Sequence, residues 1–237
     1  TLFGLEGKTA LVTGGSDGIG RHICLKLAAQ GLRIAALGRN KDRLDAVAAE
    51  ALQGGAPAAQ GFVCDLAHTA QIDTAATAIL DDFGPIDILI NNAGIWHKAG
   101  PLDSIDPAMI EATLATNLSG AIHLTRALLP GMRSREEAAI LNVVSKSGVL
   151  AQAGQSVYTA SKYGMRGFTD VLKEDEAESG VRVAGLYQSG TNTGMFDKAG
   201  EDVPNHIFTE PDDLADVVVF MLSRPAKLWM HDVRIEL

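Results

Sequence analysis

Short apolar runs alternate with longer amphipathic stretches along the 237-residue chain. The short runs are rich in β-branched and aliphatic residues, as strands buried on both faces are. Between them, apolar residues recur at spacings of three and four, which places them on one face of a helix. The pattern predicts seven strands, over residues 9–12, 33–37, 61–64, 86–90, 139–144, 181–186 and 233–237. It predicts helices over residues 18–30, 41–53, 70–83, 104–132, 156–178 and 211–223, the fourth of them broken near Thr116 and Asn117.

This alternation indicates the fold class. Strands that are apolar on both faces and separated by helices form parallel sheets, which the helices cover on both sides through right-handed crossovers. We therefore expect an α/β fold, a doubly wound seven-stranded parallel sheet with helices on both faces. No proline-rich linker, charge run or internal repeat interrupts the alternation, so we expect one domain over residues 1–237.

The least regular segment covers residues 188–210 and is rich in glycine and polar residues. It follows the sixth predicted strand, at the edge where loops overhang the ligand crevice of a doubly wound sheet. We expect a mobile substrate loop there. Most of the apolar pocket wall is expected to come from Ile95, Trp96, Val149, Tyr187, Met195 and Phe196.

Composition and charge narrow the range of partners. The net charge is −9 and no basic block occurs, which argues against nucleic acid and favours a small-molecule ligand. No apolar stretch approaches the roughly 18 residues that a membrane span needs, and no signal-peptide pattern is present, so we expect no membrane association and a cytoplasmic location. The two cysteines and six histidines lack the spacing of metal ligands, so no metal site is predicted.

A glycine-rich turn follows the first predicted strand and opens a helix, with the sequence Thr-Gly-Gly-Ser-Asp-Gly-Ile-Gly over residues 13–20. In that context the backbone N–H groups and the helix dipole bind a pyrophosphate. Gly14 permits the tight turn, Gly18 the approach of the phosphate, and Gly20 the packing of helix on sheet. The first two glycines of this set are one residue further apart than in the usual dinucleotide fingerprint, and a plain structural turn is the alternative interpretation.

Tyr158 and Lys162 are four residues apart, so a helix would place them on one face. A phenol with its ordinary pKa of about 10 needs a fixed positive neighbour to carry protons near neutral pH, and Lys162 is spaced to be that neighbour. Ser145 ends an apolar run shortly before them. Hydride transfer to a ketone puts negative charge on the oxygen, which a Ser145 hydroxyl and a Tyr158 proton would neutralise.

Taken together, these motifs resemble the short-chain dehydrogenase/reductase family of the single-domain kind over about residues 8–223. The resemblance rests on the turn at 13–20, Asp65 after the third strand, Asn-Asn-Ala-Gly at 91–94, and Asn117, Ser145, Tyr158 and Lys162.

The resemblance implies a role for each member of the catalytic set. Tyr158 would be the general acid/base, and Ser145 would hydrogen-bond the substrate oxygen. Lys162 would lower the tyrosine pKa and bind the nicotinamide ribose, and Asn117 would anchor a water leading to Lys162. The implied cofactor contacts are Gly14, Ser16, Asp17, Gly18, Ile19, Gly20, Arg39, Asp65, Leu66, Asn92, Ala93, Gly94, Tyr158, Lys162, Thr191 and Thr193.

The end of the second strand indicates which nicotinamide cofactor is used. An acidic side chain there would bond a free ribose 2′-hydroxyl, but the sequence reads Leu-Gly-Arg-Asn over residues 37–40. Arg39 instead offers charge-assisted donors to a 2′-phosphate, so NADP(H) is favoured over NAD(H). Asp17 points the other way, because a carboxylate beside the second glycine would repel the phosphate. NAD(H) preference is therefore the alternative.

The leading functional prediction is an NADP(H)-dependent carbonyl reductase or secondary-alcohol dehydrogenase. One alternative is a catalytically idle dinucleotide sensor or scaffold, although a sensor has no need for the complete Tyr, Lys, Ser and Asn set. Another keeps an enzyme but changes the reaction to dehydration or epimerisation. The predicted helix around Tyr158 mixes small and large residues suited to packing on a second copy, so we expect a homodimer or homotetramer; these residues are Gly164, Met165, Gly167, Phe168 and Leu172.

Overall fold

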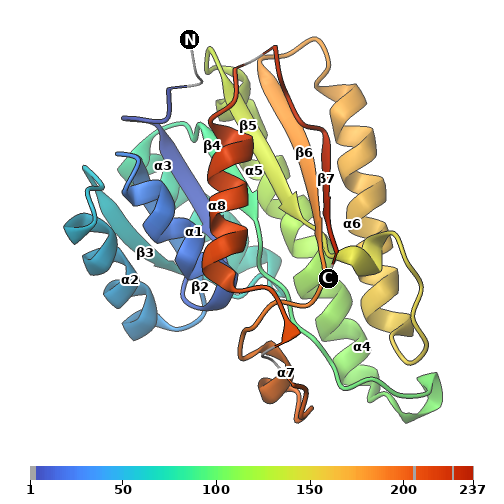
Figure 1. The fold of residues 1–237 in the computed structure, drawn as a ribbon. Helices are drawn as coiled ribbons and strands as arrows, with labels where there is room; N and C mark the ends of the chain where they lie inside the picture. The colour runs from blue at the N-terminus through green and yellow to red at the C-terminus, as the bar shows by residue number, and fades with distance from the viewer. Residues whose placement is uncertain (1–3, 205–206, 226, 237) are drawn as a thin grey trace.

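The computed structural model describes residues 4–204, 207–225 and 227–236. Within them, seven strands form one parallel sheet in the order β3-β2-β1-β4-β5-β6-β7 (Figure 1). The strands are β1 (Thr9–Thr13), β2 (Arg33–Gly38), β3 (Ala59–Val63), β4 (Ile88–Asn91), β5 (Ala138–Val143), β6 (Val181–Gln188) and β7 (Asp232–Ile235). The predicted seven-stranded doubly wound sheet is confirmed.

Helices cover both faces of this sheet (Figure 1). The α-helices of the described residues are α1 (Gly18–Ala28), α2 (Lys41–Gln53), α3 (Thr69–Phe83), α4 (Pro107–Leu114), α5 (Gly120–Arg133), α6 (Ser156–Asp175), α7 (Met195–Lys198) and α8 (Pro211–Leu222). The predicted break near Thr116 and Asn117 is confirmed, because a π-helical turn, η2 (Ala115–Ser119), joins α4 to α5.

Two apolar cores lie on opposite faces of the sheet. One packs the strands against α1, α2 and α8, and the other packs them against α3, α5 and α6. Along β1, Ala10 and Val12 belong to the first core and Leu11 to the second, as the alternation of side chains along a strand requires. Because both faces are buried, the strands read as continuous apolar runs in the sequence.

The strand order reverses beside β1, since the chain builds outward through β2 to β3 and then returns to β4 on the other side of β1. Loops after β1 and β4 therefore separate at the carboxyl edge of the sheet, where doubly wound folds bind ligands. The two loops are tied together there. Thr13 Oγ1 accepts hydrogen bonds from the backbone N–H groups of Asn92 and Ala93, both at 3.0 Å.

The described residues of segment 188–210, expected to be irregular, include the short helix α7 and a parallel bridge between Thr191 and Thr209. Residues 205 and 206 of this segment lie outside the described residues. The remainder of the segment crosses the carboxyl edge of the sheet, where α7 lies below the sheet in Figure 1. We call this segment the substrate loop below, after the role expected for it.

The expectation that Met165 and Leu172 pack against a second copy is wrong. Both side chains are buried in this protein's own core. A Cβ at Gly164 would lie 2.6 Å from Leu118 Cδ2, so this glycine also faces the interior of its own chain. The exposed apolar residues of α6 are instead Tyr163 and Val171. Spacing alone could not separate these two faces, because both carry apolar residues.

Candidate active site

A cavity of about 770 Å³ opens at the carboxyl edge of the sheet. The loops after β1 to β6 and the first turns of α6 contribute to its lining. It brings together nearly all of the predicted cofactor contacts: Gly14, Ser16, Asp17, Gly18, Ile19, Arg39, Asp65, Leu66, Asn92, Ala93, Gly94, Tyr158, Lys162, Thr191 and Thr193. Gly20 and Asn117 are not part of the lining, and both lie directly behind it.

The glycine turn leaves room for a ligand by leaving out side chains. Gly14 and Gly18 have φ values of 65° and 49°, which favour glycine. A Cβ at Gly18 would lie 3.3 Å from Thr193 Cγ2, on the opposite wall of the cavity. Gly20 packs under the turn, where a Cβ would lie 2.1 Å from Gly14 O. The expected division of roles among these three glycines fits the geometry.

Asp17 is tied into a polar cluster beside this turn. Its carboxylate accepts a hydrogen bond from Gly18 N at 2.8 Å and contacts Arg43 Nη1 at 3.0 Å and Lys198 Nζ at 2.7 Å. Burial opposes ionisation of Asp17, but the hydrogen bonds and the two positive charges outweigh burial and hold its pKa below the usual range. The negative charge of Asp17 is thus matched by cations within the protein.

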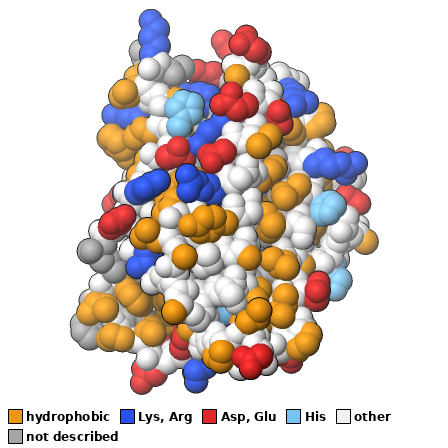
Figure 2. Space-filling view, turned by 90° about the vertical axis from the view of Figure 1, so that its right-hand side faces the viewer, with side chains coloured by type: hydrophobic (Ala, Val, Ile, Leu, Met, Phe, Trp, Pro, Cys, Tyr) orange, Lys and Arg blue, Asp and Glu red, His pale blue; other side chains and the backbone are white. Residues whose placement is uncertain are grey.

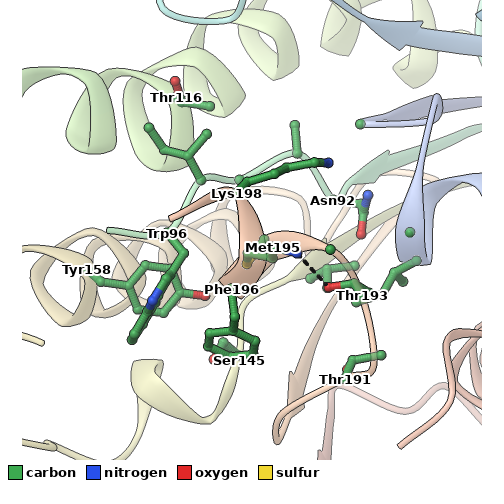
Figure 3. Close-up of a pocket in the computed structure, with 18 of the residues that line it drawn as sticks. Asn92, Trp96, Thr116, Ser145, Tyr158, Thr191, Thr193, Met195, Phe196 and Lys198 are labelled. Carbon is green, nitrogen blue, oxygen red and sulfur yellow. Dashed lines mark hydrogen bonds between the residues drawn. The ribbon is translucent and has the colours of Figure 1, made fainter. Parts of the chain in front are cut away.

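Ser145 is the only described non-glycine residue with a positive φ, at 98°. Such a backbone conformation is strained for a residue with a side chain and recurs at functional sites. Ser145 begins a short 3₁₀ turn (Lys146–Gly148), where its Oγ accepts a hydrogen bond from Ser147 N at 3.2 Å. The turn places Ser145 at the cavity wall below Tyr158 in the view of Figure 3.

Tyr158 lies in the first turn of α6, and its side chain is buried. Burial raises the pKa of Tyr158 to about 12, against the opposite effect of its hydrogen bond with Ser145. Figure 3 shows the phenol oxygen turned toward the middle of the pocket, with Trp96 in front of the ring. Tyr158 is therefore a protonated hydroxyl at neutral pH, beside a second hydroxyl.

Lys162 lies one turn further along α6 and is also buried. Its Nζ is 5.6 Å from the centre of the Tyr158 ring and donates a hydrogen bond to Val143 O at 3.4 Å. Burial lowers the pKa of Lys162 to about 8. Burial favours the neutral form of both groups, so the net pKa of Tyr158 is raised. The expected lowering of that pKa by Lys162 stays a prediction.

Asn117 faces inward from the π-helical turn η2. Its side chain accepts a hydrogen bond from Ile95 N at 2.7 Å and donates to Ile95 O at 3.0 Å and to Ser161 Oγ at 3.2 Å. A side chain at Gly94 would lie 3.4 Å from Asn117 Oδ1 and 3.6 Å from Lys162 Nζ. Asn117 thus joins the loop after β4 to α6 beside the lysine, in the kind of helix irregularity that often marks functional positions.

The opposite end of the cavity carries Arg39 and Asp65. Arg39 makes no hydrogen bond or ion pair with any residue that the structure describes, so its donors are free for a ligand. Asp65 Oδ1 accepts a hydrogen bond from Ala67 N at 3.0 Å, and its other oxygen lies 3.8 Å from His68 Nδ1. The Asp65 carboxylate thus stabilises the turn that leads into α3, whose N-cap residue is His68.

The predicted pocket wall is partly wrong. Ile95, Trp96, Met195 and Phe196 line the cavity, but Val149 and Tyr187 do not. Tyr187 is buried with Val144 and Met165 on the α6 side of the sheet. Successive residues of β6 point to opposite faces, so Gln188 rather than Tyr187 reaches the cavity.

Several lining residues had no sequence signal. Glu201 and Lys198 of the substrate loop contact Trp96 and Asp17, across sequence separations of 105 and 181 residues. Lys146, Gln152 and Phe208 also line the cavity. No local motif marks these positions, because each acquires its place only when distant segments meet.

The described residues hold no group of three or more His, Cys, Asp and Glu side chains arranged to bind a metal ion. Among their helices, none is both long enough and apolar enough to pass through a membrane.

The fold and the cavity define a class: a doubly wound α/β protein with a dinucleotide-type glycine turn facing a serine–tyrosine–lysine group. The sequence comparison gives the family. The family model described as short chain dehydrogenase matches residues 8–204, so the chain belongs to the short-chain dehydrogenase/reductase family and is an oxidoreductase.

Individual relatives support this assignment. The chain is 36% identical to a D-beta-hydroxybutyrate dehydrogenase of Cupriavidus necator, over 94% of this chain and 93% of that protein. It is also 36% identical to a D-threitol dehydrogenase of Mycolicibacterium smegmatis, over 95% of this chain and 90% of that one. A solved metagenomic short-chain oxidoreductase in complex with NADP is 33% identical, with a TM-score of 0.85 over 99% of this chain and 100% of the other.

Proposed function

We propose that the protein interconverts a carbonyl and a secondary alcohol by NADP(H)-dependent hydride transfer, with Tyr158 as the general acid/base. The observation that carries the proposal is the convergence of the Ser145–Tyr158 hydroxyl pair and Lys162 on the same cavity as the glycine turn. A reducible carbonyl next to that pair would meet two hydroxyl groups where negative charge develops.

The residues of the cavity fit a dinucleotide. The missing side chains at Gly14 and Gly18 leave a cradle at the N-terminus of α1, where backbone N–H groups and the helix dipole favour a pyrophosphate. Thr191 and Thr193 face this cradle from the substrate loop. When bound, the nicotinamide supplies or accepts the hydride.

The protein's own groups handle the proton. Because the pKa of Tyr158 is raised to about 12, its hydroxyl holds a proton across the neutral range and can donate it to an alkoxide-like oxygen. Ser145 donates a hydrogen bond to the same oxygen. Lys162 would bind the nicotinamide ribose, and Asn117 would hold a water beside the lysine.

NADP(H) preference over NAD(H) is part of the proposal. Arg39 supports it, because its donors are free and it occupies the position where an acidic side chain would select the 2′-hydroxyl. Asp17 opposes it less than the sequence suggested, since Arg43 and Lys198 already bind its carboxylate.

We extend the proposal to the organisation of the chain, as one domain with the substrate loop at 188–210 that assembles as a homodimer or homotetramer. Hydrophobic side chains gather on the side of the molecule seen in Figure 2, with charged ones between them. On α6, Val171 is 61% exposed and Tyr163 43% exposed, which is an apolar contribution that a second copy would cover. Light scattering of the purified protein measures the number of copies.

The test of function is oxidation of NADPH and of NADH, side by side, with ketones, 3-oxoacyl thioesters, steroids and sugars. We expect turnover with NADPH and a loss of about 10²- to 10⁴-fold in Tyr158→Phe, with NADPH binding retained. Tyr163→Phe is the matched control, because Tyr163 lies on the same helix and faces away from the cavity. Binding of NADPH without turnover across the panel would favour a sensor instead, and equal rates in both variants would remove Tyr158 from the mechanism.

A further inference from the structure

Trp96 joins three parts of the pocket. Its ring centre lies 4.6 Å from that of Tyr158, with the planes at 73°, and 5.5 Å from that of Phe196, with the planes at 71°. Both are edge-to-face contacts, an arrangement that aromatic pairs favour. Tyr158 comes from α6 and Phe196 from α7, so Trp96 connects the substrate loop to the tyrosine (Figure 3).

Glu201 holds Trp96 in this position. Its Oε2 accepts a hydrogen bond from Trp96 Nε1 at 2.5 Å, and its Oε1 accepts one from Ala99 N at 3.0 Å. Each oxygen of one carboxylate is thus used by a donor of the same loop, the loop that follows β4. Bonds of this kind to an ionised acceptor are stronger than neutral ones. A glutamine could not replace them both, because its amide group would turn an N–H donor toward another donor.

A second side-chain attachment of the substrate loop, through Lys198, is weaker. Lys198 contacts Asp17 at 2.7 Å, but the two side chains are 62% and 46% exposed. Exposed ion pairs contribute little in water. The Glu201 carboxylate is the stronger of these two polar connections, and it acts on the ring that touches Tyr158.

We propose that Glu201 is a positioning residue: through the Trp96 indole it keeps the Tyr158 ring at the angle that turns its hydroxyl into the pocket. The inference rests on the proposed function, in which Tyr158 carries the proton. Without Glu201, the indole N–H loses its acceptor and the ring is free to leave Tyr158. The position of the substrate loop then no longer determines the orientation of the Tyr158 phenol.

The first experiment reads the position of Trp96 without any turnover. The chain has two tryptophans, and Trp229 donates its indole N–H to Val183 O at 3.0 Å, away from the cavity. In a Trp229→Phe background, emission therefore reports Trp96 alone. We expect Glu201→Gln to shift this emission and to raise its quenching by acrylamide. Asp202→Asn is the matched control, because Asp202 is the adjacent exposed carboxylate.

The second experiment is a double-mutant cycle on turnover. Trp96→Phe keeps an aromatic ring against Tyr158 and removes the N–H donor together with the second ring of the indole. Glu201→Gln and Trp96→Phe are each expected to lower kcat about tenfold, the loss of one hydrogen bond to a charged group. If they act through the same bond, the double variant also loses about tenfold rather than about a hundredfold. NADPH affinity is expected to stay at the wild-type value.

The outcomes separate this inference from the proposed function. Unchanged quenching of Trp96 in Glu201→Gln, or additive losses in the cycle, would overturn the positioning role while leaving the reductase intact. A wild-type protein that oxidises no NADPH with any carbonyl would overturn the proposed function, and with it the catalytic meaning of the contact. The same shift in Asp202→Asn would show that the quenching reports general loosening of the loop, and would also count against Glu201.

Discussion

The two ends of the cavity are built by different means. At the glycine turn, space and donors come from the backbone, through positive φ values at Gly14 and Gly18 and a close contact under Gly20. At the substrate end, the wall is built by side chains such as Trp96 and Glu201, which meet across 105 residues of sequence. The first end is specified within a few consecutive residues, and the second only by the folded chain.

This difference shows which part of the site is open to change. A backbone cradle binds the part of a ligand that is the same for every dinucleotide, and nearly any added atom would fill it. A wall of side chains can be replaced residue by residue while the fold is kept, so we expect it to set the choice of substrate. Substitutions at the glycine turn are therefore expected to abolish the site. Substitutions in the side-chain wall are expected to change the activity by degrees.

The largest effect is expected at Gly20. An alanine there would place its Cβ 2.1 Å from Gly14 O, a backbone atom that cannot move without opening the turn. We expect Gly20→Ala to lose at least about 1–3 kcal/mol of unfolding free energy, the usual cost of overpacking, together with dinucleotide binding. Chemical denaturation and NADPH titration measure the two losses.

Gly167→Ala is the matched control for that change. Gly167 is also helical, but a Cβ there meets nothing within 4 Å. Alanine in such a position stabilises a helix by about 0.5–1 kcal/mol relative to glycine. Similar results from the two variants would mean that helix propensity, rather than the contact under the turn, decides the outcome at Gly20.

Lys162 lies between the two ends and gives a pH-dependent prediction. Burial lowers its folded-state pKa to about 8, below the 10.5 of an ordinary lysine. Between these values the unfolded chain binds the extra proton, so the cost of burying the charged amine is present in full below pH 8 and is relieved as pH rises toward 10.5. Lys162→Met should therefore gain stability relative to the wild type near pH 7.

That gain should shrink across the same window, by up to about 1.4 kcal/mol for each pH unit. Unfolding curves of both proteins, recorded from pH 7 to about 10.5, measure the difference. The raised pKa of Tyr158 makes both proteins less stable at still higher pH and so cancels in the comparison. A difference that stays constant with pH would show that the amine is solvated rather than buried.

The contrast between the two ends also explains what the sequence could predict. The sheet, its helices and the glycine turn follow from local periodicity and from short motifs, and the structure confirms them. Tyr158, Lys162 and Ser145 were predicted to act together from their spacing and residue types, and all three line one cavity, while their catalytic roles stay a prediction. The raised tyrosine pKa was not predicted, because the degree of burial is a property of the packed pocket.

Other features required the folded chain. The pocket-facing side of β6 depends on strand register, so Tyr187 was placed in the pocket wall when Gln188 occupies it. Met165 and Leu172 looked suited to a second copy because an apolar helix face does not identify its partner. No sequence motif marked Glu201, since its hydrogen bonds are to a loop more than a hundred residues away in the sequence.

The glycine-turn end of the cavity is built mostly from backbone, and Arg39 is the residue that adds a side chain to it. Its substitution is therefore expected to have the most selective effect. Loss of its hydrogen bonds to a 2′-phosphate should cost about 1.5–3 kcal/mol, which is about 10- to 100-fold in NADPH affinity. NADH lacks that phosphate and should bind Arg39→Ala as it binds the wild type. Arg126→Ala is the control, because Arg126 is exposed on α5 and lies outside the cavity lining.

The ratio of the NADPH and NADH affinities tests the role of Arg39 better than either affinity alone. A fall for NADPH only would place the 2′-phosphate at Arg39 and show that the carboxylate of Asp17, bound by Arg43 and Lys198, does not repel it. An equal fall for both cofactors would mean that Arg39 acts on the adenosine in general. No change for either would leave Arg43 and Lys198 as the remaining cations near the turn, and preference for NADP(H) would lose its main support.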